Sequence, residues 1–270
     1  MQSDLQTSES GTIPGARGMA NSALIFYGRG AELGDFKVMS RSLATELRGH
    51  YAPSRIIQRN VELRSDFFDL LKSPPVSGLI GELHVFSHSI GGGLFLAYHD
   101  THRRDDRIAA MDAAGRRGSR LSYTEVLANE IGTVFTDDLI RHPWVGYRNQ
   151  IRLKFAANAK IKLWGCNAGI ESWVYSDNNM IGAVGPINEY YFRALNEQNV
   201  PKPSIAQAFA DYFGRPTFGA ESGSHIEVHD GGRWMKTSQY RARRGHWPRP
   251  RLLHRLVPDI GTYREFRPSP

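Results

Sequence analysis

The sequence predicts an α/β fold built on a mostly parallel β-sheet with helices on both faces. Short apolar runs that end in glycine alternate with segments of helical period, a pattern typical of parallel strands joined by helices. Hydrophobic residues make up 40 % of the 270 residues, which is enough for a sizeable core. We expect a disordered polar leader at 1–20, one α/β domain at 21–230 and a basic C-terminal segment at 231–270.

The first part of the chain contains three predicted strands and two predicted helices. Apolar runs bounded by glycine or other breakers predict strands at 23–30, 54–62 and 81–88. Apolar residues recur at helical spacing over 35–51, with Asp35 as the N-cap. Ser65 is predicted to cap a short helix at 66–72, which Pro74 stops.

Three consecutive glycines, Gly91 to Gly93, follow the third predicted strand. Each glycine costs about 1 kcal/mol relative to alanine inside a helix, so a helix is not expected to start here. The apolar residues at 94–98 therefore predict a short hairpin strand directly after the third strand.

The second part of the chain continues the alternation. We expect helices at 122–135, 151–159, 188–198 and 204–214, a fourth strand at 160–169, and a fifth strand with a hairpin at 216–234. A capping box of Ser122 and Glu125 opens the first of these helices. Ser204 caps the last one, and Gly214 ends it.

The net charge of +7 is concentrated near the C-terminus. No Asp or Glu occurs between Gly231 and Pro258, and Trp234 and Trp247 are interleaved with the basic residues. Such a segment can bind nucleic acid, anionic lipid or an acidic partner protein, or it can form a solvated basic face. The basic residues are Arg233, Lys236, Arg241, Arg243, Arg244, Arg249, Arg251 and Arg255.

Two reactive side chains stand at the ends of predicted strands. His88 ends the third strand, and Cys166, the one cysteine of the chain, ends the fourth. The carboxyl ends of parallel strands share one edge of the sheet, with neighbours about 4.8 Å apart. A thiolate from Cys166 and a general base from His88 can then cleave a peptide bond. The backbone N–H groups of Ser89 and Cys166 are the expected oxyanion donors.

This pattern resembles the caspase-like cysteine peptidases of clan CD, most closely the self-processing cysteine protease domains of large bacterial toxins. Members place a catalytic His after one apolar strand, then a short hairpin, and the Cys after the next strand of the sheet. E-L-H-V-F-S-H-S-I-G-G-G matches the His block, and A-K-I-K-L-W-G-C-N-A-G matches the Cys block. Ser89 departs from the family, which usually has glycine after the His.

The resemblance implies a caspase-like fold and a bacterial effector or toxin that acts as a cysteine endopeptidase. Its expected partners are a protein or peptide substrate and an inhibitor or immunity protein, with no cofactor and no metal. Arg29 corresponds to an arginine with which caspases bind an acidic substrate side chain. With one cysteine and no Sec signal peptide, we expect synthesis in the cytoplasm. The resemblance to toxin domains implies export by a route that needs no signal peptide. No apolar run approaches the roughly 20 residues of a membrane span.

Two alternatives remain open from the sequence. The stretch F-S-H-S-I-G-G-G also resembles the nucleophile motif of α/β-hydrolases such as lipases, with Ser89 as nucleophile at a strand-to-helix elbow. The second alternative is a caspase-like scaffold without activity that binds a partner through its basic segment. His84, at even spacing from His88, is expected to be a hydrogen-bonded core histidine rather than a base.

Overall fold

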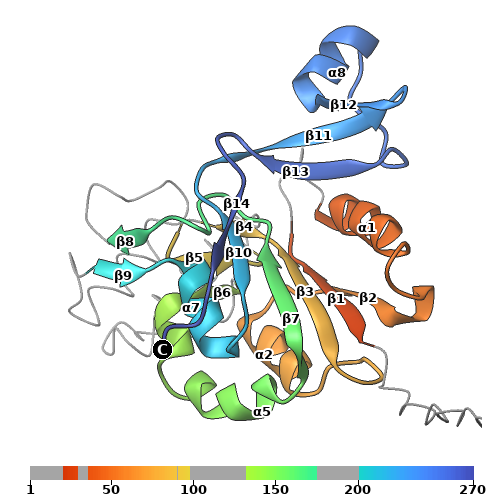
Figure 1. The fold of residues 1–270 in the computed structure, drawn as a ribbon. Coiled ribbons are helices and arrows are strands. Elements are labelled where there is room, and N and C mark those ends of the chain that lie inside the picture. Colours follow the sequence, from red (N-terminus) through yellow and green to blue (C-terminus); the bar gives the residue numbers. More distant parts are fainter. Residues whose placement is uncertain (1–20, 30–35, 90, 98–131, 175–200) are drawn as a thin grey trace, which may run out of the picture.

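The computed structural model describes residues 21–29, 36–89, 91–97, 132–174 and 201–270. Within these residues the chain forms several helices around one central sheet (Figure 1). No helix in this part of the chain is long and apolar enough to cross a bilayer. The predicted leader at 1–20, the helix at 188–198 and most of the helix at 122–135 lie outside the described residues.

The central sheet has six strands and confirms the predicted α/β class with a mostly parallel sheet. The strands are β1 (Ser22–Tyr27), β2 (Ile56–Asn60), β3 (Ile80–Phe86), β7 (Phe155–Leu163), β10 (Thr217–Ala220) and β14 (Tyr263–Phe266). They pair in the order β14-β10-β7-β3-β1-β2. All neighbours run parallel except β14, which is antiparallel to β10.

The helices and 3₁₀ turns are α1 (Phe36–Leu47), α2 (Arg64–Lys72), α5 (Arg148–Arg152), α7 (Ile205–Phe213), α8 (Thr237–Arg244), η1 (Pro53–Arg55), η3 (Thr136–Leu139) and η4 (Trp144–Tyr147).

Alternate residues of β1 join two different apolar clusters, because successive side chains of a strand point to opposite sides. Ala23 and Ile25 pack in one cluster with residues of α1. Leu24 and Phe26 pack in the larger cluster with residues of α2, α5 and α7.

Both ends of α7 follow the sequence prediction, whereas the start of α2 does not. The Ser204 hydroxyl accepts a backbone N–H of the first turn of α7 at 3.2 Å, and Gly214 ends the helix in the left-handed region at φ 65°. Both predictions are confirmed. The predicted cap at Ser65 is wrong, because α2 already begins at Arg64 with an extended Leu63 at the N-cap position.

The predicted hairpin after the third strand is confirmed. It belongs to a small sheet of β4 (His88–Ser89), β5 (Gly93–Phe95) and β6 (Thr133–Phe135). β4 runs antiparallel to β5, which in turn pairs with β6. Residues 133–135 are therefore a buried strand and not the end of the predicted helix at 122–135, because pairing with β5 satisfies their backbone.

The predicted helix at 151–159 is wrong for most of its length. α5 ends at Arg152, and β7 begins at Phe155. Phe155 and Ala159 contribute to the larger apolar cluster as strand residues. β7 pairs on both sides, with β3 and with β10, and these tertiary contacts outweigh the local helical pattern.

The C-terminal lobe (residues 224–258) consists of β11 (Ser224–Asp230), β12 (Arg233–Lys236), α8 and β13 (His254–Pro258). β11 pairs antiparallel with β12, as predicted, and also with β13. The chain then returns to the central sheet as β14 (Figure 1). The expected boundary at residue 230 therefore does not separate two units, since strands from both sides of it pair. One further two-stranded pair joins β8 (Ser172–Val174) to β9 (Pro201–Pro203).

Candidate active site

The ends of β3 and β7 bring His88 and Cys166 into neighbouring positions. The two strands are adjacent and parallel, with Val85 opposite Leu163. Trp164 extends the pairing, because its backbone N–H donates to the Val85 carbonyl at 2.9 Å. Extended beyond the end of this pairing, the same register would set His88 opposite Cys166.

The rings that precede these two residues show which side of the sheet they face. Phe86 lies two residues before His88, and Trp164 lies two residues before Cys166. Their rings stack, with 5.0 Å between the centroids and 7° between the planes. His88 then packs edge-on against Phe36 of α1, with centroids 5.1 Å apart. Phe36, Phe86 and Trp164 belong to one cluster, so the His88 ring lies on the α1 side.

Tyr263 of β14 lies on the same side of the sheet as the His88 ring. Its ring packs against Trp164 with centroids 5.2 Å apart, within the same cluster. Burial raises the pKa of the Tyr263 hydroxyl above its usual range, and a charge on Cys166 raises it further. The Tyr263 hydroxyl is therefore coupled electrostatically to Cys166.

Gly165 lets the end of β7 approach the hairpin after β3. A Cβ at Gly165 would lie 2.5 Å from the Ser89 Cβ and 2.9 Å from the Ser87 carbonyl oxygen. Such distances are too short for any side chain, so the site requires glycine. Because Ser87 and Ser89 flank His88, this contact fixes the chain around His88 against the residue before Cys166.

Cys166 lies at the start of a turn that is anchored to the neighbouring strand. Asn167 adopts a left-handed conformation at φ 56°, and its N–H donates to the Ser222 carbonyl at 2.8 Å. The Gly169 N–H donates to the Ala220 carbonyl at the end of β10, also at 2.8 Å. The cysteine itself is free and half-buried. The turn thus holds Cys166 in position without enclosing it in the core.

Ser89 occupies a strand and not the head of a helix. It lies opposite Leu94 in the β4–β5 hairpin. Its side chain is buried, and its hydroxyl has no hydrogen-bond partner among the described residues. A nucleophile elbow needs a helix directly after the serine, and this hairpin does not provide that geometry. The backbone nitrogen of Ser89 lies 3.3 Å from the position that a Cβ would take at Gly165, the residue before Cys166.

Arg29 follows β1 and lies at the same carboxyl edge of the sheet. Its backbone N–H donates to the Leu96 carbonyl beyond the β5 strand at 2.6 Å. Its side chain is 46 % exposed and forms an ion pair with Glu62, with 3.5 Å between Nε and Oε2. A role in substrate binding stays a prediction, in which a substrate carboxylate would compete with Glu62.

His84 is a hydrogen-bonded core histidine, as predicted. Its Nδ1 accepts the indole N–H of Trp164 at 3.3 Å, so the proton is on Nε2, which donates to Glu82 at 2.9 Å. Burial lowers the pKa of His84, while the hydrogen bond from His84 lowers the pKa of Glu82. Next to this network, burial lowers the pKa of Lys162 to about 8, and its ammonium lies 3.7 Å from the Trp164 ring centroid.

This network predicts loss of stability in mild acid. The folded protein resists protonation of His84, but the unfolded chain takes up that proton below about pH 6.5. The free energy of unfolding should therefore fall as the pH decreases from 6.5, by up to about 1.4 kcal/mol per pH unit for one proton. The lowered pKa of Glu82 adds a loss of the same sign at lower pH. Urea unfolding of the wild type and His84→Gln between pH 7.5 and 5 measures the effect.

His84→Gln should give a shallower slope of unfolding free energy against pH than the wild type. The matched control is His142→Gln, which replaces an exposed histidine. Equal slopes for His84→Gln and the wild type, or an equal change in both variants, would contradict this assignment.

Two contact residues of this site were not predicted from the sequence, Phe36 and Tyr263. Phe36 was only one apolar residue of a helix, and Tyr263 lies in a segment without any clear period. Both reach the site through tertiary packing.

Among the described residues, no group of three or more His, Cys, Asp or Glu side chains is arranged to hold a metal ion. Comparison of this chain with known protein families, curated proteins and solved structures found no match.

Proposed function

We propose that this protein is a cysteine peptidase in which Cys166 is the nucleophile and His88 the general base. The observation that supports the proposal is the pairing of β3 with β7, because its register, extended three residues past Val85 and Leu163, would set His88 opposite Cys166 at one sheet edge. The packing of the His88 ring against Phe36, the electrostatic coupling of Cys166 with Tyr263 and the close approach at Gly165 support it further.

A caspase-like fold is part of this proposal. Three features agree with the family pattern: a His directly after a central strand, a short hairpin following it, and a Cys after the neighbouring strand. The two apolar clusters, one with α1 and the other with α2, α5 and α7, support helices on both faces of the sheet.

The reaction would proceed in two halves. His88 removes the proton of the Cys166 thiol, and the sulfur attacks the carbonyl carbon of the peptide bond. As the tetrahedral intermediate collapses, the C–N bond breaks and His88 gives the proton to the leaving amine. His88 then takes a proton from water, the resulting hydroxide attacks the thioester, and the thiolate leaves to be reprotonated.

The tetrahedral intermediate carries a negative oxygen that needs hydrogen-bond donors. The proposed donors are the backbone N–H groups of Ser89 and Cys166. Ser89 stands where the family usually has glycine, but the extended hairpin conformation of β4 accommodates a side chain there. Its Cβ points toward Gly165, so the absence of a side chain at Gly165 compensates for the presence of one at Ser89.

Alkylation of the thiol tests this proposal directly. Cys166 is the one cysteine, so the iodoacetamide adduct that is absent from Cys166→Ala in intact-mass measurements lies on it. At pH 7 we expect alkylation about tenfold or more faster than that of N-acetylcysteine, because a thiolate beside His88 is the reactive form. His88→Gln should reduce the rate to that of the model thiol, and His50→Gln is the matched control.

Two results would overturn the proposal. One is a wild-type alkylation rate at or below that of N-acetylcysteine, with no change in His88→Gln. The other is labelling of Ser89 by a fluorophosphonate probe, which would instead support the α/β-hydrolase alternative.

A further inference from the structure

The C-terminal lobe carries a group of cationic side chains without acidic partners. Eight basic residues lie between Gly231 and Pro258, and two of them form ion pairs with acids of β11. Arg244 binds Asp230 at 2.7 Å, and Arg255 binds Glu227 at 2.7 Å. The other six are exposed and form no ion pair with any residue that the structure describes: Arg233, Lys236, Arg241, Arg243, Arg249 and Arg251. Together with Trp247 we name these six residues the basic surface.

Trp247 adds an aromatic ring to the basic surface. It is 42 % exposed, and it is the one large apolar side chain within 231–258 that is exposed to this degree. The Arg241 guanidinium lies over its ring, 4.7 Å from the centroid. An exposed indole with a guanidinium over one face leaves its other face suited to stacking against a nucleic-acid base, and neighbouring cations suit phosphate.

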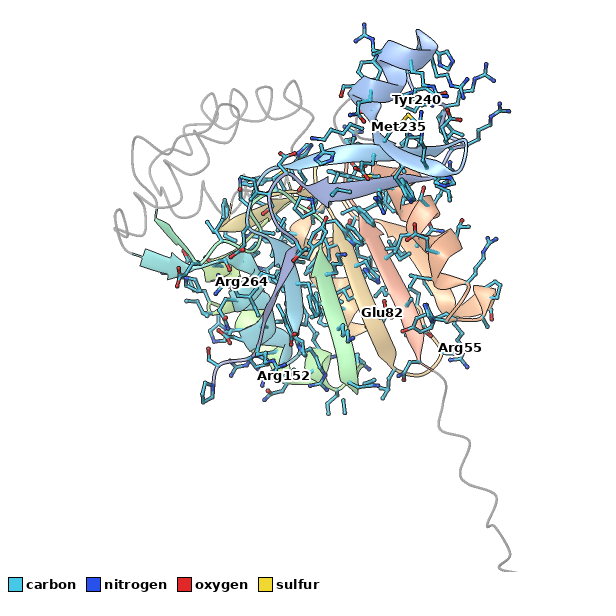
Figure 2. All side chains as sticks on the ribbon, turned by 45° about the horizontal axis from the view of Figure 1, so that its top comes forward. Arg55, Glu82, Arg152, Met235, Tyr240 and Arg264 are labelled. Carbon is cyan, nitrogen blue, oxygen red and sulfur yellow. The ribbon has the colours of Figure 1, made fainter. Side chains whose placement is uncertain are left out.

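The shape of the lobe favours a flexible polyanion over a flat membrane. The cations come from β12, from α8 and from the loop at 245–253. On α8, Arg241 and Arg243 lie on nearly opposite sides of the helix, because each helical residue turns about 100° around the axis. Figure 2 shows nitrogen-tipped side chains projecting outward around α8. A bilayer can contact only one side of such a lobe, and Trp247 alone would be its apolar anchor.

We propose that the basic surface binds single-stranded nucleic acid. The guanidinium groups contact successive phosphates, and a base stacks on Trp247. Arginine supplies five of the six unpaired cations, and its planar fork binds phosphate oxygens in pairs. The proposed contacts involve neither Cys166 nor His88, so the inference does not depend on peptidase activity.

Fluorescence anisotropy of fluorescein-labelled 20-mers tests the proposal with the full chain. The probes are mixed-sequence single-stranded DNA, the same sequence as RNA, and the DNA duplex, each titrated between 50 and 300 mM salt. Six phosphate contacts on a single strand predict a slope of log K against log salt of about −4. Removing four cations in Arg241→Gln/Arg243→Gln/Arg249→Gln/Arg251→Gln should reduce the slope by about 3.

Two further variants separate stacking from charge. Trp247→Ala should weaken single-strand binding about tenfold without changing the salt slope, and Trp247→Phe should retain most of the affinity. The matched control is Arg48→Gln/Arg59→Gln, which removes two exposed arginines outside the lobe. The DNA and RNA arms decide which nucleic acid binds more tightly.

Three results would overturn the inference. The first is an affinity for the single strands that is unchanged in the variant with four Arg→Gln substitutions, or that falls equally in the control variant. The second is tighter binding to the duplex than to either single strand. The third is cosedimentation with phosphatidylcholine vesicles containing 30 % phosphatidylserine at salt concentrations where no oligonucleotide binds, which would assign the surface to a membrane.

Discussion

Cys166→Ala is expected to lower kcat/KM for peptide cleavage by roughly ten thousandfold or more, since removing a covalent nucleophile leaves only binding and oxyanion stabilisation. His88→Ala should cause a loss of similar size, and the double variant should be no worse than either single one, because the two residues act as a unit. Cleavage products of a proteome-derived peptide library, quantified by mass spectrometry, provide the measurement.

Ser89→Ala is the matched control for this prediction. The buried Ser89 hydroxyl lies in a hairpin strand, and the proposed donor at this position is the backbone N–H, which alanine keeps. We expect Ser89→Ala to retain activity within about tenfold, far above Cys166→Ala. Loss of activity in Ser89→Ala with retention in Cys166→Ala would reverse the assignment. Absence of cleavage by the wild type would favour the scaffold alternative.

Arg64→Met is expected to destabilise the fold by about 3–5 kcal/mol, because it leaves a buried carboxylate without its counter-charge. Arg64 of α2 pairs with Asp138 of η3 at 2.8 Å, and both side chains are at most 3 % exposed. The second carboxylate oxygen of Asp138 accepts the Phe135 backbone N–H at 2.7 Å. The pair therefore ties α2 to the end of β6. Urea denaturation at pH 7 measures the change in unfolding free energy.

The double variant Arg64→Met/Asp138→Asn separates the buried charge from the packing. It removes both charges and keeps an amide oxygen that can accept the Phe135 N–H. We expect it to be more stable than Arg64→Met alone, since no unpaired charge remains. A loss below about 1 kcal/mol in Arg64→Met would show that the ion pair is not important for stability. A double variant as unstable as the single one would assign the loss to packing around Trp144. The Cζ atom of Arg64 lies 5.6 Å from the centroid of the Trp144 ring.

Local patterns in the sequence were sufficient for several elements. The apolar runs of β1 and β3 lie between breakers, and they are strands within a few residues of the predicted bounds. The prediction of a hairpin after β3 depended on Gly91 to Gly93, because three glycines disfavour a helix. The α/β-hydrolase alternative needs a helix at this position, directly after Ser89. Ser204 and Gly214 located both ends of α7, because caps depend on neighbouring residues alone.

Other elements were not predictable, because their partners are distant in the sequence. Residues 155–159 have a pattern compatible with a helix, and only pairing with β3 and β10 makes them part of β7. The C-terminal residues 263–266 show no clear period, yet they form the antiparallel edge strand of the central sheet. Contacts of Phe36 with His88, and of Tyr263 with the region of Cys166, likewise depend on the fold.

The sequence by itself determined that a histidine and the one cysteine each follow an apolar strand, and that no helix starts at Ser89. It determined this because strand ends, glycine turns and caps are local properties of the chain. Only the tertiary structure decided that β3 and β7 are neighbours, that the His88 ring packs against Phe36 of α1, and that Gly165 permits the close contact between the segments of His88 and Cys166. These relations depend on which strands pair across 70 or more intervening residues, and packing of the whole sheet sets that choice.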